Sequence, residues 1–545
     1  MRRGRWSAVL LTALLAWLVA GPLAVVFTEA AGADVAAFAR EPTEWQALWA
    51  SLWISAASVA LSALLGVPLA FVFERYDFPG RRVLGALVAL PAVMPPLVGV
   101  IAFYFLYGET GFVSHALQAA FRLDGAPWRL QGPGAILLVH AYSMYVYFYL
   151  FVRAALARMD ASVLEAAASL GAGGAETFRR VTLPLLRPAL AGAALLTFMT
   201  SLGSFSAPLL YGGGFRVMTT QIRNTSVNGD QALALLETAV LTTVALLGFA
   251  LVQWQERRGA SVASVGKGTP PALRAIANPF ARRAAAAAGW LLAVLLLLPH
   301  GTLLLVSFVP VGTWTTEALP PVLALGNYRQ MLTEKERLGS LLNSLWMASA
   351  ATAGAIALAL WAGPIVARGR RALGRVIETL LALPWAVPGT VLAVAMATMF
   401  SVRAPWLGRF VLVGTVAILP LAYLVRNLPL TGRAVLAGFR QLDPALDEAA
   451  RSLGAGRWRR LLRITMPLLK PALAAGGALA FVTALGDFVV SVILETYANR
   501  PISAQIFSSL RVNELGVAAA FGVVLMVVSA AALGVGARAG GAGDR

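Results

Sequence analysis

The chain has 545 residues, of which 59% are hydrophobic and only 13% are charged, a composition that excludes a soluble globular domain. Its formal net charge of +19 comes from 44 Lys and Arg against 25 Asp and Glu. It has no cysteine, which excludes disulfides and thiolate metal sites. We therefore expect a membrane protein whose helices each use about 20 mostly apolar residues to cross the bilayer.

Twelve apolar segments of that length follow one another, six before and six after a polar, basic stretch at 255–284. The expected fold class is an all-α polytopic membrane protein built as two parallel six-helix repeats. The first half covers 1–254 and the second 285–545, with 255–284 as a linker between them. The predicted spans are 7–28, 51–73, 84–107, 133–152, 188–210, 232–254, 285–309, 341–366, 376–400, 408–425, 471–494 and 515–537.

The basic residues set the expected orientation. Arg2, Arg3 and Arg5 precede the first span, which is too long for a secretory signal and is expected to be retained. The positive-inside rule then places both chain ends and the linker in the cytoplasm. Under this topology 32 of the 44 Lys and Arg lie on that side. Topology therefore explains the net charge, and no nucleic-acid partner is expected.

One charged, glycine-broken segment occurs twice. Residues 165–190 match residues 448–473 at 16 of 26 positions, 283 residues apart, and Phe205 is likewise repeated as Phe488. The same orientation of both copies indicates a parallel duplication about an axis along the membrane normal. We therefore expect the transport pathway between the two halves.

Each copy falls in a loop, at 160–188 and at 443–471, and we name these loops elbow 1 and elbow 2. Asp160 and Asp443 are expected to cap a short helix that Gly171 and Gly454 end. A loop resting on anionic headgroups is the alternative, but headgroup binding requires no fixed spacing. The repeated spacing favours a rigid docking element, and its candidate contact residues are Glu165, Ala166, Ala167, Gly171, Pro184, Glu448, Ala449, Ala450, Gly454 and Pro467.

The repeated Glu-Ala-Ala, Gly and Pro pattern resembles the signature of binding-protein-dependent ABC importer permeases of the type I fold. The stretch from Gly486 to Ser503 resembles the fused two-half permeases of the iron(III) group, and thiamine, aminophosphonate and polyamine permeases are built similarly. The resemblance implies a multi-pass protein of the bacterial cytoplasmic (inner) membrane. Its implied partners are two ABC ATPase subunits and a periplasmic or extracellular substrate-binding protein.

No phosphate-binding loop occurs in the sequence, so the chain is expected to be a transport subunit and not an enzyme. It is expected to hold no cofactor of its own, with ATP and magnesium bound by the partner ATPase. The three histidines are scattered, and no metal site is expected.

Asp487, predicted near the middle of span 471–494, is the best candidate for a pathway residue, either attracting a cation or pairing with an arginine. The alternative is that it lies near a helix end or in a water-filled vestibule and has a structural role. Its counterpart in the first repeat is Ser204. The paired motifs at Pro91–Pro96 and Pro384–Pro388 are either hinges or helix starts. An ion-coupled secondary transporter also has twelve helices, but it has no reason to keep two identical elbows.

Overall fold

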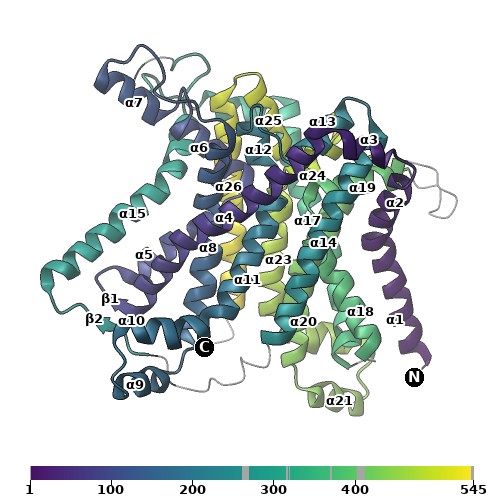
Figure 1. Cartoon of the computed structure of the whole chain (residues 1–545). Helices are drawn as coiled ribbons and strands as arrows, with labels where there is room; N and C mark the ends of the chain where they lie inside the picture. The colour runs from purple at the N-terminus through teal and green to yellow at the C-terminus, as the bar shows by residue number, and fades with distance from the viewer. Residues whose placement is uncertain are drawn as a thin grey trace.

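The computed structural model describes residues 2–259, 269, 271–314, 317, 319–368, 371–401 and 411–541. Helices form nearly all of this part of the chain, and two short strands, β1 (Tyr76–Asp77) and β2 (Arg274–Ala275), pair in parallel. Figure 1 shows the long helices side by side in one bundle, with short helices at both ends. The structure is therefore the expected all-α membrane architecture.

The helices of the first half follow the predicted order. They are α1 (Arg2–Leu15), η1 (Ala16–Ala20), α2 (Gly21–Ala30), α3 (Val35–Arg40), α4 (Pro42–Arg75), α5 (Arg81–Val88), η2 (Leu90–Val93), α6 (Pro96–Tyr107), α7 (Phe112–Phe121), α8 (Gly132–Ala157), α9 (Ala161–Ser169), α10 (Gly174–Thr177), η3 (Phe178–Thr182), α11 (Leu183–Leu202), α12 (Ser206–Tyr211), α13 (Met218–Val227) and α14 (Gln231–Gly259).

The second half repeats this order. Its helices are α15 (Pro279–Val306), α16 (Gly326–Thr333), α17 (Lys335–Arg368), α18 (Arg371–Ala382), η5 (Leu383–Trp385), α19 (Gly389–Ser401), α20 (Ile418–Gln441), α21 (Pro444–Ser452), α22 (Arg457–Arg460), η7 (Leu461–Thr465), α23 (Met466–Leu485), α24 (Val489–Leu494), η8 (Tyr497–Asn499), α25 (Ile502–Arg511) and α26 (Leu515–Gly541).

Ten helices in the described part of the chain are long and apolar enough to span a bilayer, and a bent pair, α18 with α19, supplies an eleventh candidate. Helix α20 is the remaining long helix, and it packs against α17 and α23. It carries Arg426, Arg433 and Arg440, which lower its hydropathy. With α20 included, the helices correspond in order to the twelve predicted spans.

The tenth predicted span was misplaced. We predicted residues 408–425, but the helix begins at Ile418 and continues to Gln441; residues 408–410 lie outside the described part of the chain. The arginines of this segment suggested a loop, because charged residues are rare within spans. The helix keeps them because they face a cavity or an ion-pair partner, as described below. The 32 Lys and Arg assigned to the cytoplasmic side include Arg426, Arg433 and Arg440 as loop residues, but all three lie within this helix.

Four other predicted spans are interrupted. Spans 84–107 and 376–400 break at the proline motifs, and α18 and α19 meet at a bend of 108°. Spans 188–210 and 471–494 break after Gly203 and Gly486, where α11 and α23 end. Asp487 therefore lies in a break between two helices, not in the middle of a helix. Proline removes a backbone donor and glycine has a low helix propensity, so both residue types mark these breaks.

The two halves pack their helices in the same pattern. Helix α4 packs on α8 and α11, as α17 packs on α20 and α23. Individual hydrogen bonds repeat as well: the Met218 amide donates to Ser51 Oγ and the Ile502 amide to Ser344 Oγ, each at 2.7 Å. Ser51 and Ser344 belong to matching Ser-Leu-Trp segments. The sequence repeat is therefore a structural repeat.

The first helix of each half packs on the opposite half. Helices α1 and α2 contact α18 and α19 of the second half, and α15 contacts α5 and α6 of the first. In Figure 1 these helices lie on opposite flanks of the bundle. The linker also contacts the first half. Strand β2 pairs with β1, and the Ala161 amide donates a hydrogen bond to the Thr269 carbonyl at 3.0 Å.

Candidate functional site

Elbow 1 has the predicted cap and the predicted stop. The Asp160 side chain accepts a hydrogen bond from the Ser162 amide at 3.0 Å and so caps α9. Gly171 has a φ of +79°, and the Ala172 and Gly171 amides donate back to the Ala167 and Ala168 carbonyls at 3.0 Å. This is a Schellman closure, which depends on glycine in the left-handed conformation.

Elbow 2 is built in the same way. Asp443 caps α21 by accepting from the Ala445 amide at 2.9 Å, and Gly454 has a φ of +76°. The Ala455 amide donates to the Ala450 carbonyl at 3.0 Å. An ion pair that elbow 1 lacks adds a brace: Asp447 contacts Arg460 at 2.8 Å, and the position equivalent to Asp447 is Leu164 in elbow 1.

Both elbows expose apolar side chains at matching positions. Leu170 and Leu453 are each 88% exposed. Glu165, Ala166, Glu448 and Ala449 are exposed too, whereas Ala167 and Ala450 are buried and face the body of the elbow. Figure 1 shows α9 and α21 on one face of the molecule, the face on which α1 begins and α26 ends. The structure thus presents two equivalent exposed knobs on one side of the bundle.

Each elbow leads into a long helix of the bundle. From Gly174 to Leu202, the helical turns α10, η3 and α11 follow without a gap, and α22, η7 and α23 do the same in the second half. Pro184 and Pro467 are the second residues of α11 and α23, two positions after the wide π-helical turns η3 and η7 end. A proline ring clashes with the carbonyl four residues earlier, and a wider turn relieves that clash. A displacement of an elbow can therefore be transmitted along one continuous rod.

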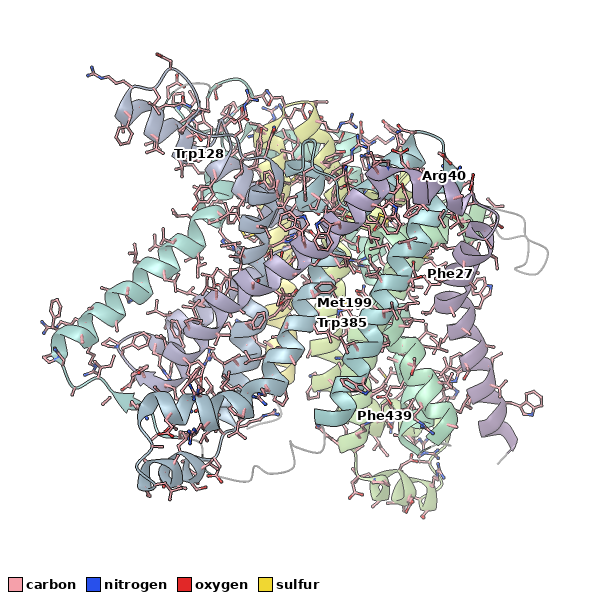
Figure 2. The ribbon with its side chains drawn as sticks, viewed as in Figure 1. Phe27, Arg40, Trp128, Met199, Trp385 and Phe439 are labelled. Atoms are coloured by element: carbon pink, nitrogen blue, oxygen red, sulfur yellow. The ribbon has the colours of Figure 1, made fainter. Side chains whose placement is uncertain are left out.

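A cavity of about 1040 Å³ lies between the halves. It is lined by α8, α11 and α14 of the first half and by the α18–α19 break, α20 and α23 of the second. Figure 2 shows Met199 and Trp385, lining residues from opposite halves, about halfway along the bundle. Arg187 and Trp254, near the elbow ends of α11 and α14, also line the cavity, which therefore extends toward the elbow face.

A smaller cavity of about 340 Å³ adjoins the first, and Tyr147, Thr200, Gly203, Arg426 and Thr483 line both. The helix breaks surround this junction. The rings of Phe205 and Phe488, the repeated phenylalanines, lie 5.9 Å apart between the halves, and both side chains are buried. Two equivalent residues, one from each half, therefore make the predicted pathway narrow at its centre.

The glycine of each helix break meets the proline motif of the opposite half. A Cβ atom built on Gly486 would lie 2.7 Å from Pro95 Cβ, and one on Gly203 would lie 3.6 Å from Pro388 Cα. Small residues allow such close backbone approach within a membrane. The proline motifs are thus the start of α6 and α19 and also part of the contact between halves.

Asp487 pairs with an arginine, which is one of the predicted alternatives. Its Oδ2 lies 2.8 Å from Arg426 Nε, and its Oδ1 accepts from the Val490 amide at 2.9 Å. The Asp487 side chain is 2% exposed and that of Arg426 is 29% exposed. A Cβ at Gly389 would overlap the Arg426 guanidinium, so glycine leaves room for the guanidinium in this position.

Ser204, the counterpart of Asp487, belongs to a hydrogen-bond network around a histidine that the sequence did not single out. His140 Nε2 lies 2.9 Å from Ser204 Oγ, and its Nδ1 lies 2.9 Å from Ser58 Oγ and 3.2 Å from Ser201 Oγ. Tyr423 stands 283 residues after His140 and bonds Ser491 Oγ at 2.6 Å. The two halves thus have different polar groups at equivalent positions.

The comparisons with known proteins agree with this geometry. The sequence profile described as binding-protein-dependent transport system inner membrane component matches residues 62–260 and 355–537, one region in each half. The chain belongs to this family. It is a permease subunit of an ABC importer, and the two matched regions make it a fused two-half permease.

Relatives of the permease include transport proteins named for different cargoes. It is 34% identical over 475 residues to the probable ABC transporter permease protein y4fN of Sinorhizobium fredii, covering 87% of this chain and 83% of that protein. It is 30% identical to the ferric transport system permease protein FbpB of Actinobacillus pleuropneumoniae, covering 88% and 69%. It is 29% identical to the thiamine transport system permease protein ThiP of Escherichia coli, covering 87% of each.

The described part of the permease contains no group of three or more His, Asp or Glu side chains placed to hold a metal ion. The cavity between the halves is lined instead by aromatic, aliphatic and arginine side chains.

Proposed function

We propose that the permease moves its cargo by alternating access, driven by two separate ABC ATPase subunits that dock on elbow 1 and elbow 2. The observation that carries this proposal is the pair of equivalent, exposed knobs at the ends of continuous helical rods. Residues on those rods, Arg187 to Gly203 and Leu479 to Thr483, line the cavity. Movement of the elbows toward each other would therefore change the shape of the cavity.

The exposed side chains of the two elbows define the proposed docking surface. Glu165, Ala166, Glu448 and Ala449 face outward beside Leu170 and Leu453 and form the contact surface, whereas Ala167 and Ala450 pack inward and hold its shape. Gly171 and Gly454 fix the helix ends, and Pro184 and Pro467 lie at the starts of α11 and α23 within the rods. Burial of two leucines that are exposed in the free permease would contribute about 1.5–3 kcal/mol each to docking.

The proposal includes location and partners. The elbow face, both chain ends and the linker would lie in the cytoplasm of a bacterium, with the permease in the cytoplasmic (inner) membrane. Cargo would reach the opposite face on a substrate-binding protein, and ATP and magnesium would be bound by the ATPase subunits. The basic residues near the elbows, Arg179, Arg180, Arg459 and Arg463, support this orientation through the positive-inside rule.

For the cargo we propose iron(III), supported by the ferric relatives that share its fused architecture. Thiamine is the second candidate, because the thiamine permease of Escherichia coli is aligned over 87% of both chains at nearly the same identity.

The docking proposal is tested with paired glycine substitutions. Gly171→Val and Gly454→Val place a β-branched residue at a positive φ, although no atom lies within 4 Å of the added Cβ. Gly173→Val is the matched control, because Gly173 is equally open and has an extended backbone. We expect the first two variants to insert normally and to lose binding-protein-stimulated ATP turnover by about tenfold or more, equivalent to about 1.4 kcal/mol. Unchanged stimulation in the double variant would reject docking through the elbows.

A further inference from the structure

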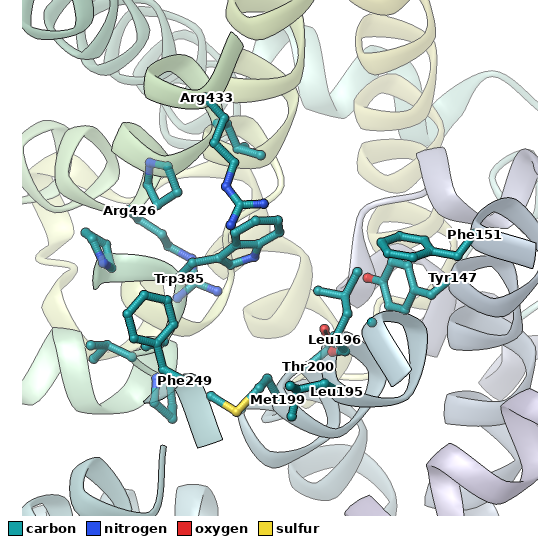
Figure 3. Close-up of a pocket in the computed structure, with 18 of the residues that line it drawn as sticks. Tyr147, Phe151, Leu195, Leu196, Met199, Thr200, Phe249, Trp385, Arg426 and Arg433 are labelled. Atoms are coloured by element: carbon teal, nitrogen blue, oxygen red, sulfur yellow. Dashed lines mark hydrogen bonds between the residues drawn. The ribbon is translucent and has the colours of Figure 1, made fainter. Parts of the chain in front are cut away.

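Two glutamates of the first half are buried where α4 and α14 begin. Glu44 is 1% exposed and Glu237 is 0% exposed. Figure 1 shows the neighbouring helices α3 and α13 at the end of the bundle opposite the elbows, which we call the outer end. Neither acid lines either cavity described above. Figure 3 shows Phe249 of α14 at the larger cavity, and Glu237 precedes it by 12 residues, about 18 Å along the helix. The cavities therefore do not account for these two acids.

Helix α13 holds the two carboxyl groups side by side. Gln221 Nε2 donates to Glu44 Oε1 at 2.8 Å, and Thr225 Oγ1 donates to Glu237 Oε1 at 2.8 Å. Gln221 and Thr225 are four residues apart and therefore lie on one face of α13, one turn from each other. The carboxyl groups of Glu44 and Glu237 are in hydrogen-bond contact with each other. One oxygen of each carboxyl group thus receives a hydrogen bond from α13.

The other oxygen of each carboxyl group has no donor. Glu44 Oε2 and Glu237 Oε2 are buried, and no described residue donates a hydrogen bond to them. An ionised carboxylate is only an acceptor, so two ionised carboxylates form no hydrogen bond with each other, and their buried charges repel. A protonated carboxyl group has one O–H donor. One proton between the two groups therefore removes one charge and supplies the missing hydrogen bond.

The elements packed around the two acids supply no counter-charge among the described residues. No ion pair joins Glu44 or Glu237 to a cation. Arg223 on α13 instead interacts with Arg511 of the second half, and α19 has no charged residue. The other charged or histidine side chains on or beside the packed helices are exposed or have other partners: Glu29, Asp34, Arg40, Glu41, His140, Arg153, Arg187 and Asp230.

The second half has no such pair. The positions equivalent to Glu44 and Glu237 are Arg337 and Phe521. Arg337 pairs with Glu514 at 3.1 Å, so this half has an ordinary ion pair near its outer end. The duplicated fold therefore forms without two acids at this place. What the acid pair adds is specific to the first half.

We propose that Glu44 and Glu237 form a proton-binding site in which the two carboxyl groups share one proton. The proton joins α4 to α14 beside α13, and both α13 and α14 contact α19 of the second half. Loss of the proton leaves two buried negative charges in contact and so weakens the packing of these helices. The site thus makes the packing of the outer end depend on pH. This inference is independent of ATPase docking and of the identity of the cargo.

Infrared spectroscopy of the full chain in lipid nanodiscs at neutral pH measures the shared proton directly. We expect a protonated-carboxyl band that is absent from Glu44→Gln and from Glu237→Gln, because the glutamine amide donates to the remaining carboxylate in place of the proton. Glu514→Gln, which removes the ion-paired acid of the second half, is the matched control and should keep the band. A spectrum of the unaltered protein without a protonated carboxyl group overturns the inference, and so does a band that both variants retain.

Thermal unfolding gives a second measurement of the same proton. Glutamates of the unfolded chain are ionised at neutral pH, so the native state holds one proton more than the unfolded state. The stability of the native state therefore falls as the pH rises through the range in which the pair loses this proton. Between about pH 7 and about pH 9, we expect Tm to fall by several degrees more in the unaltered protein and in Glu514→Gln than in Glu237→Gln.

Two results of the unfolding measurement would overturn the inference. The first is an equal fall of Tm with pH in the unaltered protein, Glu237→Gln and Glu514→Gln. The second is a Tm that rises with the concentration of a sodium or calcium salt at constant ionic strength and does not depend on pH, because a cation and not a proton would then lie between the two carboxylates.

Discussion

At the scale of single residues, Asp487 was recognised from the sequence but its partner was not. An acid in an apolar segment is a strong signal, because burying it requires compensation. Arg426 was missed because three arginines within 15 residues suggested a loop. Their spacing of seven residues was the available signal, since it places Arg426, Arg433 and Arg440 on one helix face. The hydrogen bonds of His140 could not be predicted, because its partners come from two segments distant in the sequence, Ser58 on α4 and Ser201 and Ser204 at the end of α11.

The ion pair of Asp487 and Arg426 gives a prediction at this scale. Asp487→Asn can still accept from the Val490 amide but leaves Arg426 without its carboxylate. We expect a loss of about 1–3 kcal/mol in unfolding free energy, less than for a fully buried pair because Arg426 is partly exposed to the cavity. Thermal unfolding in detergent measures it. The double variant with Arg426→Gln should recover most of the loss, and a purely additive double variant would show that the pair is not coupled.

At the scale of elements, the elbows could be predicted because their signals are local. An aspartate cap and a glycine stop each act within a few residues, and both occur where expected. The breaks in the long helices depend instead on contacts between the halves. Gly486 lies against Pro95, about 390 positions away in the sequence, and hydropathy cannot show that contact. Continuous spans were therefore predicted where the chain forms bent pairs.

The two glycines at these breaks should respond differently to the same substitution. Gly486→Ala would place its Cβ 2.7 Å from Pro95 Cβ, whereas Gly203→Ala would meet Pro388 only at 3.6 Å. Neither glycine has a positive φ, so the backbone tolerates alanine at both positions. We expect Gly486→Ala to destabilise the protein by about 1–3 kcal/mol through overpacking and Gly203→Ala to be close to neutral. Equal melting temperatures for both variants would contradict this difference between the two glycine–proline contacts.

At the scale of the whole molecule, the duplication was visible in the sequence, and the cavity lies between the repeats as expected. The sequence did not predict that the first helix of each half packs on the opposite half. An apolar segment indicates that a helix spans the bilayer but not which neighbour it contacts, and α1, α2 and α15 pack across the boundary between halves. Each half therefore depends on the other for part of its packing, and both elbows belong to one packed helix bundle.

The central claim is that both elbows contact ATPase subunits in the cytoplasm, and the absence of native cysteine allows a direct measurement. Leu170→Cys and Leu453→Cys would each be tested for thiol cross-linking to the ATPase in inverted and right-side-out vesicles. Val227→Cys, 71% exposed near the opposite face, is the control. We predict that both elbow cysteines cross-link to an ATPase subunit and react only from the cytoplasmic side, while Val227→Cys reacts only from the other. Labelling of either elbow from outside, or cross-linking of neither, would contradict the account.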